Sequence, residues 1–325
     1  MSEMISAFEE SPLARDVREG LARVDKRLPP WLFYDAVGSQ IYEQITELPE
    51  YYPTRAERSI FETQADAIVS AVAGPSRDAI HVAELGAGTA TKSQILLRAV
   101  ARRQDVATFL AIDVSSSALA IASARFAREE PRVHFRAQVA HHEQSFDTIR
   151  RLGQRQLVLF IGSSIGNYDD DDARRLLRGV SRSLLPGGAL LLGTDLRKSP
   201  SVLVPAYDDA QGVTAAFNLN VLARINRELG GHFRLDRFAH VALWNEAKSR
   251  IEMHLESRAD QVVRVDGLGL HVTLRRGERI HTESSVKYDD AHVDALFGTS
   301  GLVRERSFLD AEGRFALHLA RVVKS

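Results

Sequence analysis

The sequence contains no cysteine among its 325 residues. Without cysteine there are no disulfides, thiolate metal sites or cysteine nucleophiles, and a reducing compartment is the natural expectation. There is also no excess of charge of one sign, because the sequence has 42 Lys and Arg residues and 43 Asp and Glu residues, for a formal net charge of −1. A nearly neutral protein has no long-range attraction for nucleic acid or an anionic membrane. We therefore expect a small-molecule partner, and neither nucleic acid nor membrane.

Long apolar runs are also absent. Crossing a bilayer takes about 20 consecutive apolar residues, and no run approaches that length. The first ten residues lack the basic and then apolar pattern of a secretory signal. These features predict a cytoplasmic protein, which we expect to be a monomer. With 44% hydrophobic residues the chain can form a sizeable core, and its length indicates two domains or one domain with a large insertion.

A glycine turn stands where a predicted strand meets a predicted helix. The apolar run 80–85 precedes Gly86 and Gly88, and apolar residues then recur at helical spacing from Lys92 onward. Both glycines lack a Cβ and can adopt φ > 0, so a ligand can approach the backbone there. Dinucleotide sites usually have a third glycine where this chain has Thr91. The departure favours an adenosine ligand without a pyrophosphate, of which S-adenosylmethionine is the commonest.

Asp113 supports this interpretation. It lies at the end of the second predicted strand, 106–114, where an acid is placed to accept hydrogen bonds from both ribose hydroxyls. From these features alone, the alternative is a plain tight turn with a surface aspartate. Asn167 follows the fourth predicted strand, 157–161. Because ligands of open α/β sheets bind beyond the carboxyl ends of the strands, we expect Asn167 near the same crevice.

The order of predicted elements indicates an α/β fold with a doubly wound sheet. Strands alternate with helices up to residue 195, and the chain ends in a helix and a hairpin, as the seven-stranded sheet of class I, Rossmann-like methyltransferases does. The interval 197–285 interrupts this order with a helix of its own, about 206–228, and several strands. The predicted strands of the sheet are 80–85, 106–114, 133–139, 157–161, 189–195, 303–309 and 314–323.

Two domains follow from this order. Residues 59–196 and 286–325 are expected to form a domain that binds S-adenosylmethionine. Residues 1–58 and 197–285 are expected to form an α+β cap domain that binds the substrate. In the cap, Tyr51 and Tyr52 lie between two prolines, each of which disfavours helix in the residue before it, so an extended loop is predicted. These tyrosines either pack beneath the loop or face a ligand as part of a lid.

Two clusters of possible metal ligands have simpler explanations. The acids 169–172 precede a predicted helix, 173–185, where they offset the helix macrodipole. Consecutive side chains of a starting helix also diverge rather than converge on a cation. His141 and His142 are neighbours, which rarely point at one ion, and no thiolate can complete a site. We expect no metal.

Several motifs, taken in order, resemble those of the histidine-specific Nα-methyltransferases of ergothioneine biosynthesis. These enzymes use S-adenosylmethionine to trimethylate the α-amino group of free L-histidine, which gives hercynine. The resemblance runs from about residue 15 to the C-terminus. Its motifs are Leu48-Pro-Glu-Tyr-Tyr-Pro-Thr-Arg55, Glu84-Leu-Gly-Ala-Gly-Thr89, Gly162-Ser-Ser-Ile-Gly-Asn167, Gly193-Thr-Asp-Leu196, Ala206-Tyr-Asp-Asp-Ala210, Phe217-Asn-Leu-Asn220, Ile251-Glu-Met253 and Thr282-Glu-Ser-Ser285.

The resemblance implies a role for individual cofactor residues. Lys92 would face the methionine carboxylate of the cofactor and Asp113 its ribose, with Gly86 and Gly88 forming the turn between them. The family usually has an Asp followed by an aromatic residue after the third strand, where the pair meets the adenine. This chain has Val-Ala-His-His-Glu at 139–143. Either His141 takes part of that role in cofactor binding or the loop is shifted.

The resemblance also implies a substrate site. Glu283 and Ser285 would hold the imidazole, for which the alternative from the sequence alone is an exposed strand face. Tyr34 would be the catalytic residue that orients the reacting amine, and the faces of Tyr34 and Phe33 would suit a quaternary ammonium. Asn167 and Tyr207 would hold the substrate carboxylate. The implied substrate residues are Tyr51, Asn167, Tyr207, Met253, Glu283 and Ser285.

Two other functions are open. One is an amine methyltransferase of the same fold that acts on another aromatic amino acid or on a histidine derivative. The other is a non-catalytic protein that binds S-adenosylmethionine.

Overall fold

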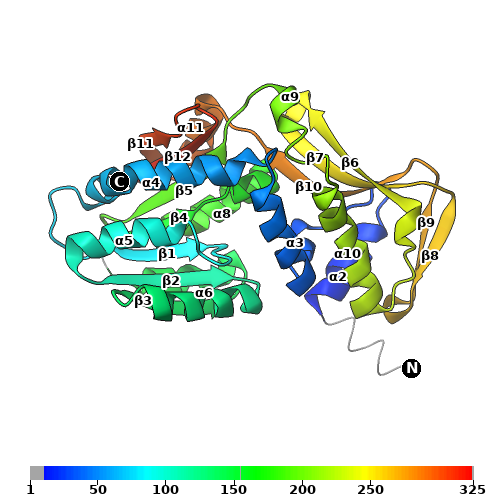
Figure 1. The fold of residues 1–325 in the computed structure, drawn as a ribbon, viewed down its shortest axis with the longest axis horizontal. Coiled ribbons are helices and arrows are strands. Elements are labelled where there is room, and N and C mark those ends of the chain that lie inside the picture. Colours follow the sequence, from blue (N-terminus) through cyan, green and yellow to red (C-terminus); the bar gives the residue numbers. More distant parts are fainter. Residues whose placement is uncertain (1–10, 154, 324–325) are drawn as a thin grey trace. The chain divides into compact units, whose positions relative to one another are not determined.

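The computed structural model describes residues 11–153 and 155–323 (Figure 1). The chain forms two compact units. The sheet unit comprises Pro53–Lys198 and Ser285–Ser325, and the second unit comprises Met1–Tyr52 and Ser199–Ser284. These bounds lie a few residues from those of the two expected domains. The first ten residues of the expected cap domain lie outside the described residues. The assignment of cofactor to one unit and substrate to the other stays a prediction.

A seven-stranded sheet with the order β11-β12-β5-β4-β1-β2-β3 forms the middle of the sheet unit. Strands β1 to β5 are parallel, whereas β12 is antiparallel to β5 and β11 is antiparallel to β12. The strand order reverses beside β1, and in open α/β sheets ligands bind at this point. The predicted doubly wound α/β fold is confirmed. The strands are β1 (His81–Leu85), β2 (Ala107–Asp113), β3 (Val133–Val139), β4 (Gln156–Phe160), β5 (Ala189–Asp195), β11 (Leu302–Leu309) and β12 (Phe315–Val322).

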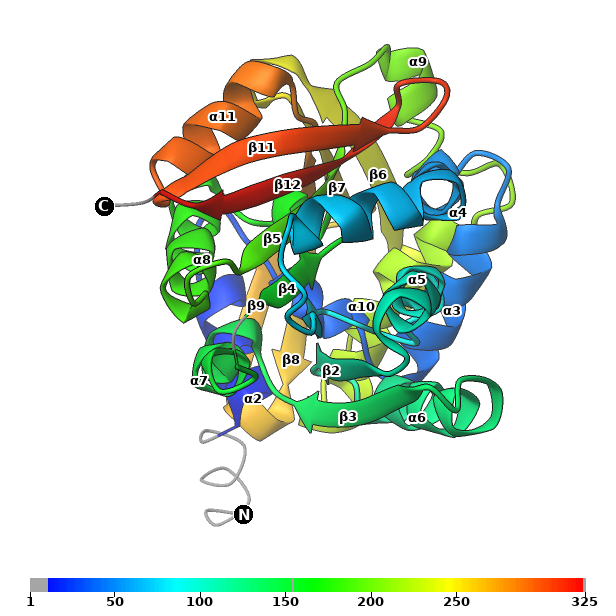
Figure 2. The ribbon, with the colours of Figure 1, turned by 90° about the vertical axis from the view of Figure 1, so that its left-hand side faces the viewer.

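Helices cover both faces of this sheet, as Figure 2 shows. One face, to which β1 contributes Val82, packs against α4, α5 and α6, and the other, to which β1 contributes Ala83, packs against α7, α8 and α11. Strands covered on both sides must be apolar throughout, and β4 is buried at every residue. The helices are α4 (Tyr52–Ala73), α5 (Ser93–Gln104), α6 (Ser116–Glu129), α7 (Phe146–Arg150), α8 (Asp170–Ser183) and α11 (Asp290–Gly298), with the 3₁₀ helices η2 (His142–Ser145) and η3 (Ser164–Asn167).

The second unit has its own hydrophobic core and two small sheets. One has the order β10-β7-β6, and β8 and β9 form the other, an antiparallel pair. Ile251, Met253 and Leu255 of β7 are all buried, as their predicted shared face requires. The strands are β6 (Phe238–Asn245), β7 (Arg250–Ser257), β8 (Gln261–Val265), β9 (Leu270–Leu274) and β10 (Arg279–Val286). The helices are α2 (Pro12–Leu21), α3 (Ala36–Glu47), α9 (Pro200–Leu203) and α10 (Val213–Leu229), with η1 (Pro30–Phe33), η4 (Leu235–Arg237), η5 (Glu246–Lys248) and η6 (Asp266–Leu268).

The helix expected over 206–228 begins later than predicted, because α10 starts at Val213. The carboxylate of Asp209 accepts hydrogen bonds from the N–H groups of Val213 at 3.0 Å and Thr214 at 2.7 Å. Gly212 adopts a φ of 73°, outside the helical region. An aspartate that binds nearby backbone N–H groups competes with helix formation. Apolar periodicity does not reveal this competition.

The extended loop expected between Pro49 and Pro53 is shorter than predicted. Helix α4 begins at Tyr52, so Pro53 lies in its first turn, where the missing N–H of a proline would have no helical partner. Tyr51 lies outside the helix and is buried. The predicted loop is therefore wrong for Tyr52, because a proline in the first turn favours the start of a helix.

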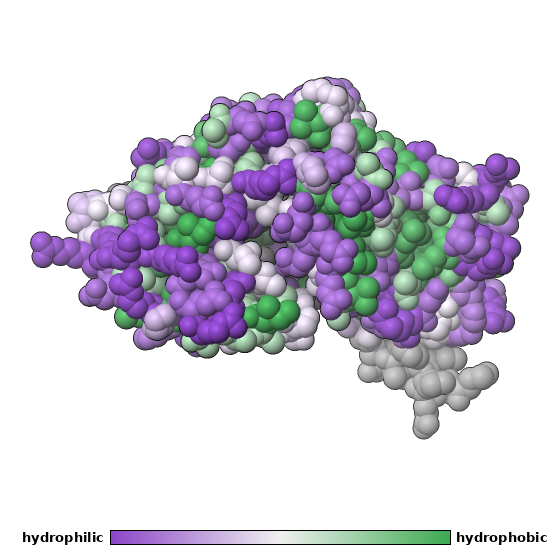
Figure 3. Space-filling model, in the orientation of Figure 1, coloured by the Kyte–Doolittle hydropathy of each residue, from purple (hydrophilic) through white to green (hydrophobic). Residues whose placement is uncertain are grey.

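The surface is mixed in character. On the face shown in Figure 3, hydrophilic side chains are spread over the described residues with hydrophobic ones scattered between them. Within residues 11–153 and 155–323, no helix is both long enough and apolar enough to span a membrane.

Candidate active site

The glycine turn has the geometry that the sequence predicts. Gly86 and Gly88 adopt φ values of 73° and 52°. The N–H of Gly88 donates to Oδ2 of Asp113 at 2.8 Å, and the N–H of Ser115 donates to Oδ1 at 2.8 Å. Each carboxylate oxygen has a second lone pair. Asp113 therefore holds the turn against the end of β2 and still has acceptor capacity.

Lys92 is held by an acid that the sequence did not single out. Its ammonium forms an ion pair with Glu57 of α4, whose side chain is fully buried. The other carboxylate oxygen of Glu57 accepts a hydrogen bond from the N–H of Gly162 at 2.7 Å. Glu57 thereby links Lys92 to the end of β4. No motif marks it, and the available signal was a charge beside the buried Ala56 and Ile60 of an amphipathic helix.

A second buried acid lies beside the turn. Glu84 of β1 accepts a hydrogen bond from the hydroxyl of Ser93. Burial raises the pKa of Glu84 to about 8, and the Ser93 hydrogen bond and the charge of Lys92 offset only part of that effect. The carboxyl group is therefore largely protonated at neutral pH, and it adds little negative charge near Lys92.

The two adjacent histidines have different surroundings. His141 is exposed, and its backbone N–H donates to Oε1 of Gln144 in η2 at 3.1 Å. Nε2 of His142 lies 3.5 Å from the position that a Cβ on Gly86 would take, and its Nδ1 is 2.9 Å from the hydroxyl of Tyr168. Burial lowers the pKa of His142, which keeps the ring neutral at neutral pH. The structure thus brings His142, which sequence reasoning did not choose, to the glycine turn, and a role for His141 stays a prediction.

Two expected substrate residues lie in adjoining segments of the sheet unit. Asn167 ends η3, and η3 packs against β10 so closely that a Cβ on Gly166 would lie 2.9 Å from the backbone oxygen of Val286. Only glycine permits this approach. Ser285 precedes Val286 on β10, and its hydroxyl accepts a hydrogen bond from Nζ of Lys287 at 2.8 Å.

Tyr34, Tyr51 and Tyr207 belong to one aromatic cluster of the second unit. The ring centroid of Tyr51 is 6.2 Å from that of Tyr207 and 6.4 Å from that of Tyr42. The ring of Tyr34 is 5.7 Å from Tyr42 and 5.9 Å from Phe217. These contacts are edge-to-face, which suits the ring quadrupoles. Burial raises the pKa of Tyr51 well above its usual value, so its phenol stays protonated.

Phe33 does not take the part expected of it. Its side chain is fully buried and stacks on Phe217 with centroids 4.5 Å apart. Tyr34 and Tyr42 are partly exposed. Core packing therefore occupies the face of Phe33, and Tyr42 is the ring that can share a ligand with Tyr34. No motif marks Tyr42 in the sequence.

A buried histidine supports the segment that carries Tyr207. Nε2 of His240 donates to the carbonyl oxygen of Tyr207 at 2.8 Å, and the amide of Asn218 donates to Nδ1 of His240 at 2.9 Å. Burial lowers the pKa of His240, in agreement with a neutral ring that donates at one nitrogen and accepts at the other.

Met253 and Glu283 lie on the neighbouring strands β7 and β10. Their exposed fractions are 2% and 8%. The hydroxyl of Thr282 donates to the carbonyl of Met253 at 3.0 Å, which joins the two strands at this point. An exposed strand face is therefore excluded for Glu283. A role for Glu283 in binding stays a prediction.

The acids 169–172 begin α8. The side chain of Asp169 accepts the N–H of Asp172 at 3.0 Å as the N-cap, and Asp172 forms an ion pair with Arg175 at 2.6 Å. Among the residues that the structure describes, no group of three or more His, Asp or Glu side chains is arranged to hold a metal ion.

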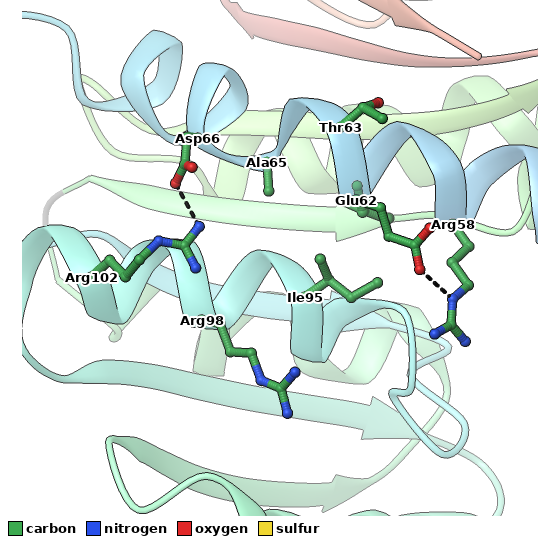
Figure 4. Close-up of a pocket in the computed structure, with 9 residues that line it drawn as sticks. Arg58, Glu62, Thr63, Ala65, Asp66, Ile95, Arg98 and Arg102 are labelled. Carbon is green, nitrogen blue, oxygen red and sulfur yellow. Dashed lines mark hydrogen bonds and ion pairs between the residues drawn. The ribbon is translucent and has the colours of Figure 1, made fainter. Parts of the chain in front are cut away.

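A groove of about 340 Å³ between α4 and α5 is separate from all of these residues (Figure 4). Arg58 and Arg102, which line it, form ion pairs with Glu62 and Asp66 at 2.7 Å. None of the predicted site residues lines the groove, so we do not assign it to the candidate site.

Comparisons with known proteins identify the family of the chain. The model of a family described as histidine-specific, SAM-dependent methyltransferases matches residues 13–322. The chain is 44% identical over 308 residues to a histidine N-alpha-methyltransferase of Mycolicibacterium smegmatis, across 95% of this chain and 94% of that protein. It is 28% identical over 283 residues to ergothioneine biosynthesis protein 1 of Neurospora crassa, across 85% of this chain and 31% of that longer protein. An L-tryptophan methyltransferase of Psilocybe serbica is 26% identical, across 93% of this chain and 90% of that protein.

A solved structure also resembles this one. The CcbJ methyltransferase from Streptomyces caelestis has a TM-score of 0.50 at 16% identity, and the match covers 90% of this chain and 100% of that one. At this identity the likeness concerns the fold alone. The family match over nearly the whole length, together with the glycine turn, shows that this chain belongs to the histidine-specific, S-adenosylmethionine-dependent methyltransferase family.

Proposed function

We propose that the protein transfers three methyl groups in succession from S-adenosylmethionine to the α-amino nitrogen of free L-histidine, which gives hercynine, a precursor of ergothioneine. The observation that carries the proposal is the 44% identity to a histidine N-alpha-methyltransferase along 95% of the chain. The buried carboxylate of Glu283, two positions before Ser285 on β10, supports it.

Residues of the sheet unit fit the cofactor. Nothing lies within 4 Å of a Cβ position on Gly88, so the turn leaves room for a ligand. Asp113 would bind the ribose with the lone pairs that its two backbone hydrogen bonds leave. Lys92, oriented by Glu57, would bind the methionine carboxylate. When bound, S-adenosylmethionine supplies an electrophilic methyl group on a sulfonium.

The chain's own contribution is alignment and exclusion of water. Methyl transfer is a direct displacement that needs an unprotonated amine lone pair in line with the methyl carbon. Tyr34 would orient that amine, directly or through a water molecule. Three rounds end in a trimethylammonium group, and the partly exposed rings of Tyr34 and Tyr42 offer faces that attract such a cation.

Substrate choice would rest on polar groups matched to an imidazole. In this proposal Asn167 and Tyr207 bind the α-carboxylate, with Tyr51 beside Tyr207. Glu283 and Ser285 bind the two ring nitrogens, and Met253 packs against the ring. A leucine or phenylalanine side chain has neither a ring N–H to donate to Glu283 nor a ring nitrogen to accept from Ser285, so it would lose the hydrogen bonds that histidine makes, at about 1–3 kcal/mol for each.

A tryptophan methyltransferase is the second candidate, because such an enzyme is 26% identical to this chain. An indole has one N–H donor and no ring acceptor, so it could satisfy Glu283 but not a donor hydroxyl at Ser285. The buried pair therefore favours histidine.

One assay separates the candidates. The protein is incubated in separate reactions with S-adenosylmethionine and one amino acid, which is histidine, tryptophan, phenylalanine or leucine. The mass of each product is measured by mass spectrometry. We expect gains of one, two and three methyl groups on histidine and none on leucine. Preferred methylation of tryptophan would replace histidine as the substrate. Cofactor binding without any turnover would indicate a non-catalytic protein.

A further inference from the structure

The sheet unit contains a fully buried ammonium group that no part of the proposed mechanism has used so far. The side chain of Lys287 has an exposed fraction of 0%, and its Nζ lies 2.8 Å from Oδ2 of Asp195, which is 1% exposed. The same Nζ donates to Oγ of Ser285 at 2.8 Å. Lys287 therefore bridges the end of β5 and the serine that is expected to bind the substrate ring.

The surroundings of this ammonium are charged. Oδ1 of Asp195 forms an ion pair with Lys198 at 2.5 Å, so one carboxylate lies between two ammonium groups. Asp310 also acts electrostatically on Lys198. Glu283 lies on the same strand as Ser285, two positions earlier. The ammonium of Lys287 is in direct contact with the Ser285 hydroxyl.

A lysine is an expensive residue to bury. Desolvation of an ion pair cancels much of its Coulombic gain, so apolar side chains of similar volume are often at least as stabilising. Packing alone therefore does not account for Lys287. Unlike an apolar side chain, the ammonium of a lysine donates hydrogen bonds, with three donors and no acceptor.

Because the ammonium can only donate, it determines in which direction the Ser285 hydroxyl can form hydrogen bonds with a ligand. Because the serine oxygen accepts from Lys287, its own hydrogen must point away from the ammonium. A neighbouring cation strengthens this O–H as a donor and disfavours a second cation beside the oxygen. A neutral imidazole offers a ring nitrogen with a lone pair, whereas an imidazolium offers only N–H donors.

We propose that Lys287, backed by Asp195, is a positioning residue that fixes Ser285 as a hydrogen-bond donor, so that the site selects the neutral imidazole over the imidazolium. The inference rests on the proposed function, because it assumes that Ser285 meets a ring nitrogen of histidine. It adds a residue that acts on specificity through Ser285 without contacting the substrate.

A double-mutant cycle tests whether Lys287 acts through Ser285. The Michaelis constant for histidine is measured for the wild type, Lys287→Met, Ser285→Ala and the double variant at about pH 8, where the ring is neutral. We expect Lys287→Met to raise it about tenfold in the wild-type background and less than about twofold in the Ser285→Ala background. Equal effects in both backgrounds would mean that Lys287 acts on stability alone, and would overturn the inference.

The pH dependence of the Michaelis constant for histidine distinguishes the proposed role of Lys287 from a purely structural one. Without the ammonium, Ser285 can rotate and accept from an imidazolium, so the ratio of the Michaelis constants of Lys287→Met and wild type should fall from about tenfold at pH 8 toward about one at pH 5.5. The control is Lys198→Met, which removes the other ammonium from Asp195 and should give a ratio that does not vary with pH. A constant ratio for Lys287→Met would contradict the proposal.

A comparison in the wild-type protein keeps the test informative if Lys287→Met does not fold. Thiazol-4-ylalanine and 2-thienylalanine have rings of similar size, but only the thiazole has a nitrogen lone pair. A donor at Ser285 should make thiazolylalanine at least about tenfold the better competitor against histidine. Equal inhibition would overturn the inference while turnover of histidine leaves the proposed function standing. Absence of histidine turnover would overturn both.

Discussion

Glu283 is the residue on which the choice of substrate depends most in this account. Its side chain is 8% exposed on β10, beside the strand that carries Met253. We predict that Glu283→Ala raises the Michaelis constant for histidine at least about tenfold, because a ring N–H would lose its charged acceptor. Steady-state kinetics with saturating S-adenosylmethionine measures this. The control is Glu256→Ala on β7, which removes a partly exposed ion pair with Arg279 and should leave the constant nearly unchanged. Near-normal histidine kinetics in Glu283→Ala would remove Glu283 from the ring site.

Glu57 makes a separate prediction for the cofactor. Glu57→Gln keeps an acceptor for the N–H of Gly162 but removes the charge that holds Lys92. A lysine released from its buried partner loses its fixed direction, so we expect the dissociation constant of S-adenosylhomocysteine, measured by calorimetry, to rise several-fold. The matched control is Glu62→Gln on the same helix, whose partner Arg58 is exposed. Unchanged or tighter binding in Glu57→Gln would show that Glu57 does not position Lys92.

The residues found from the sequence and those missed differ in a physical way. Gly86 and Asp113 could be predicted, because a glycine turn after a strand and an acid at the next strand end are local patterns. The proposed substrate residues came only through a family resemblance, since they are far apart in the chain. Glu57 and Lys287 were missed, because a buried charge carries no local signature and its partners are set by tertiary packing.

At the scale of elements, the strands of the sheet were predicted to within one residue at each end. Apolar runs covered on both faces give a strong and local signal. Helix starts were less predictable. The start of α10 depends on the carboxylate of Asp209, and the start of α4 depends on Pro53 in its first turn. Apolar periodicity reveals neither a carboxylate that binds backbone N–H groups nor a proline in the first turn of a helix.

The contact between η3 and β10 is an element-scale feature that can be tested. Gly166→Ala places a Cβ 2.9 Å from the oxygen and 3.0 Å from the nitrogen of Val286, and backbone cannot give way cheaply. We expect a loss of about 1–3 kcal/mol in the free energy of unfolding. We also expect a larger fall in kcat/KM for histidine than for S-adenosylmethionine. Gly298→Ala, where nothing lies within 4 Å, should change neither. Wild-type stability and kinetics in Gly166→Ala would show that this close packing is not needed.

His318 links three strands of the sheet, and we expect it to make the free energy of unfolding depend on pH. Its Nε2 lies 2.9 Å from Oγ1 of Thr194 on β5, and its Nδ1 lies 2.8 Å from Oγ of Ser307 on β11. Burial lowers its pKa to about 4. The unfolded state therefore binds more protons between about pH 6.5 and pH 4, and the free energy of unfolding falls as pH falls through this window, by at most about 3 kcal/mol from this residue.

Denaturant unfolding at a series of pH values measures the effect. His318→Gln should make the fall between pH 6.5 and pH 4 shallower by the part that His318 contributes, whereas His271→Gln, which removes an exposed histidine, should leave it unchanged. Parallel curves for the wild type and His318→Gln would contradict the assignment.

At the scale of the whole molecule, the chain combines a methyltransferase sheet with a second unit that has its own core. The sheet unit contains the proposed cofactor residues together with Asn167 and Ser285, and the second unit contains the proposed substrate residues Tyr34, Tyr51, Tyr207, Met253 and Glu283. The order of the predicted elements along the sequence already indicated that two separate stretches form each unit. The expected monomer stays a prediction, which light scattering of the purified protein can check.

The most direct measurement of the central claim is the number of methyl groups that one histidine accepts and the atom that carries them. With histidine limiting and S-adenosylmethionine in excess, we predict three molecules of S-adenosylhomocysteine released per histidine. We also predict a product whose nuclear magnetic resonance spectrum places all three methyl groups on the α-nitrogen. A reaction that stops after one methyl group, or one that methylates a ring nitrogen, would contradict the account.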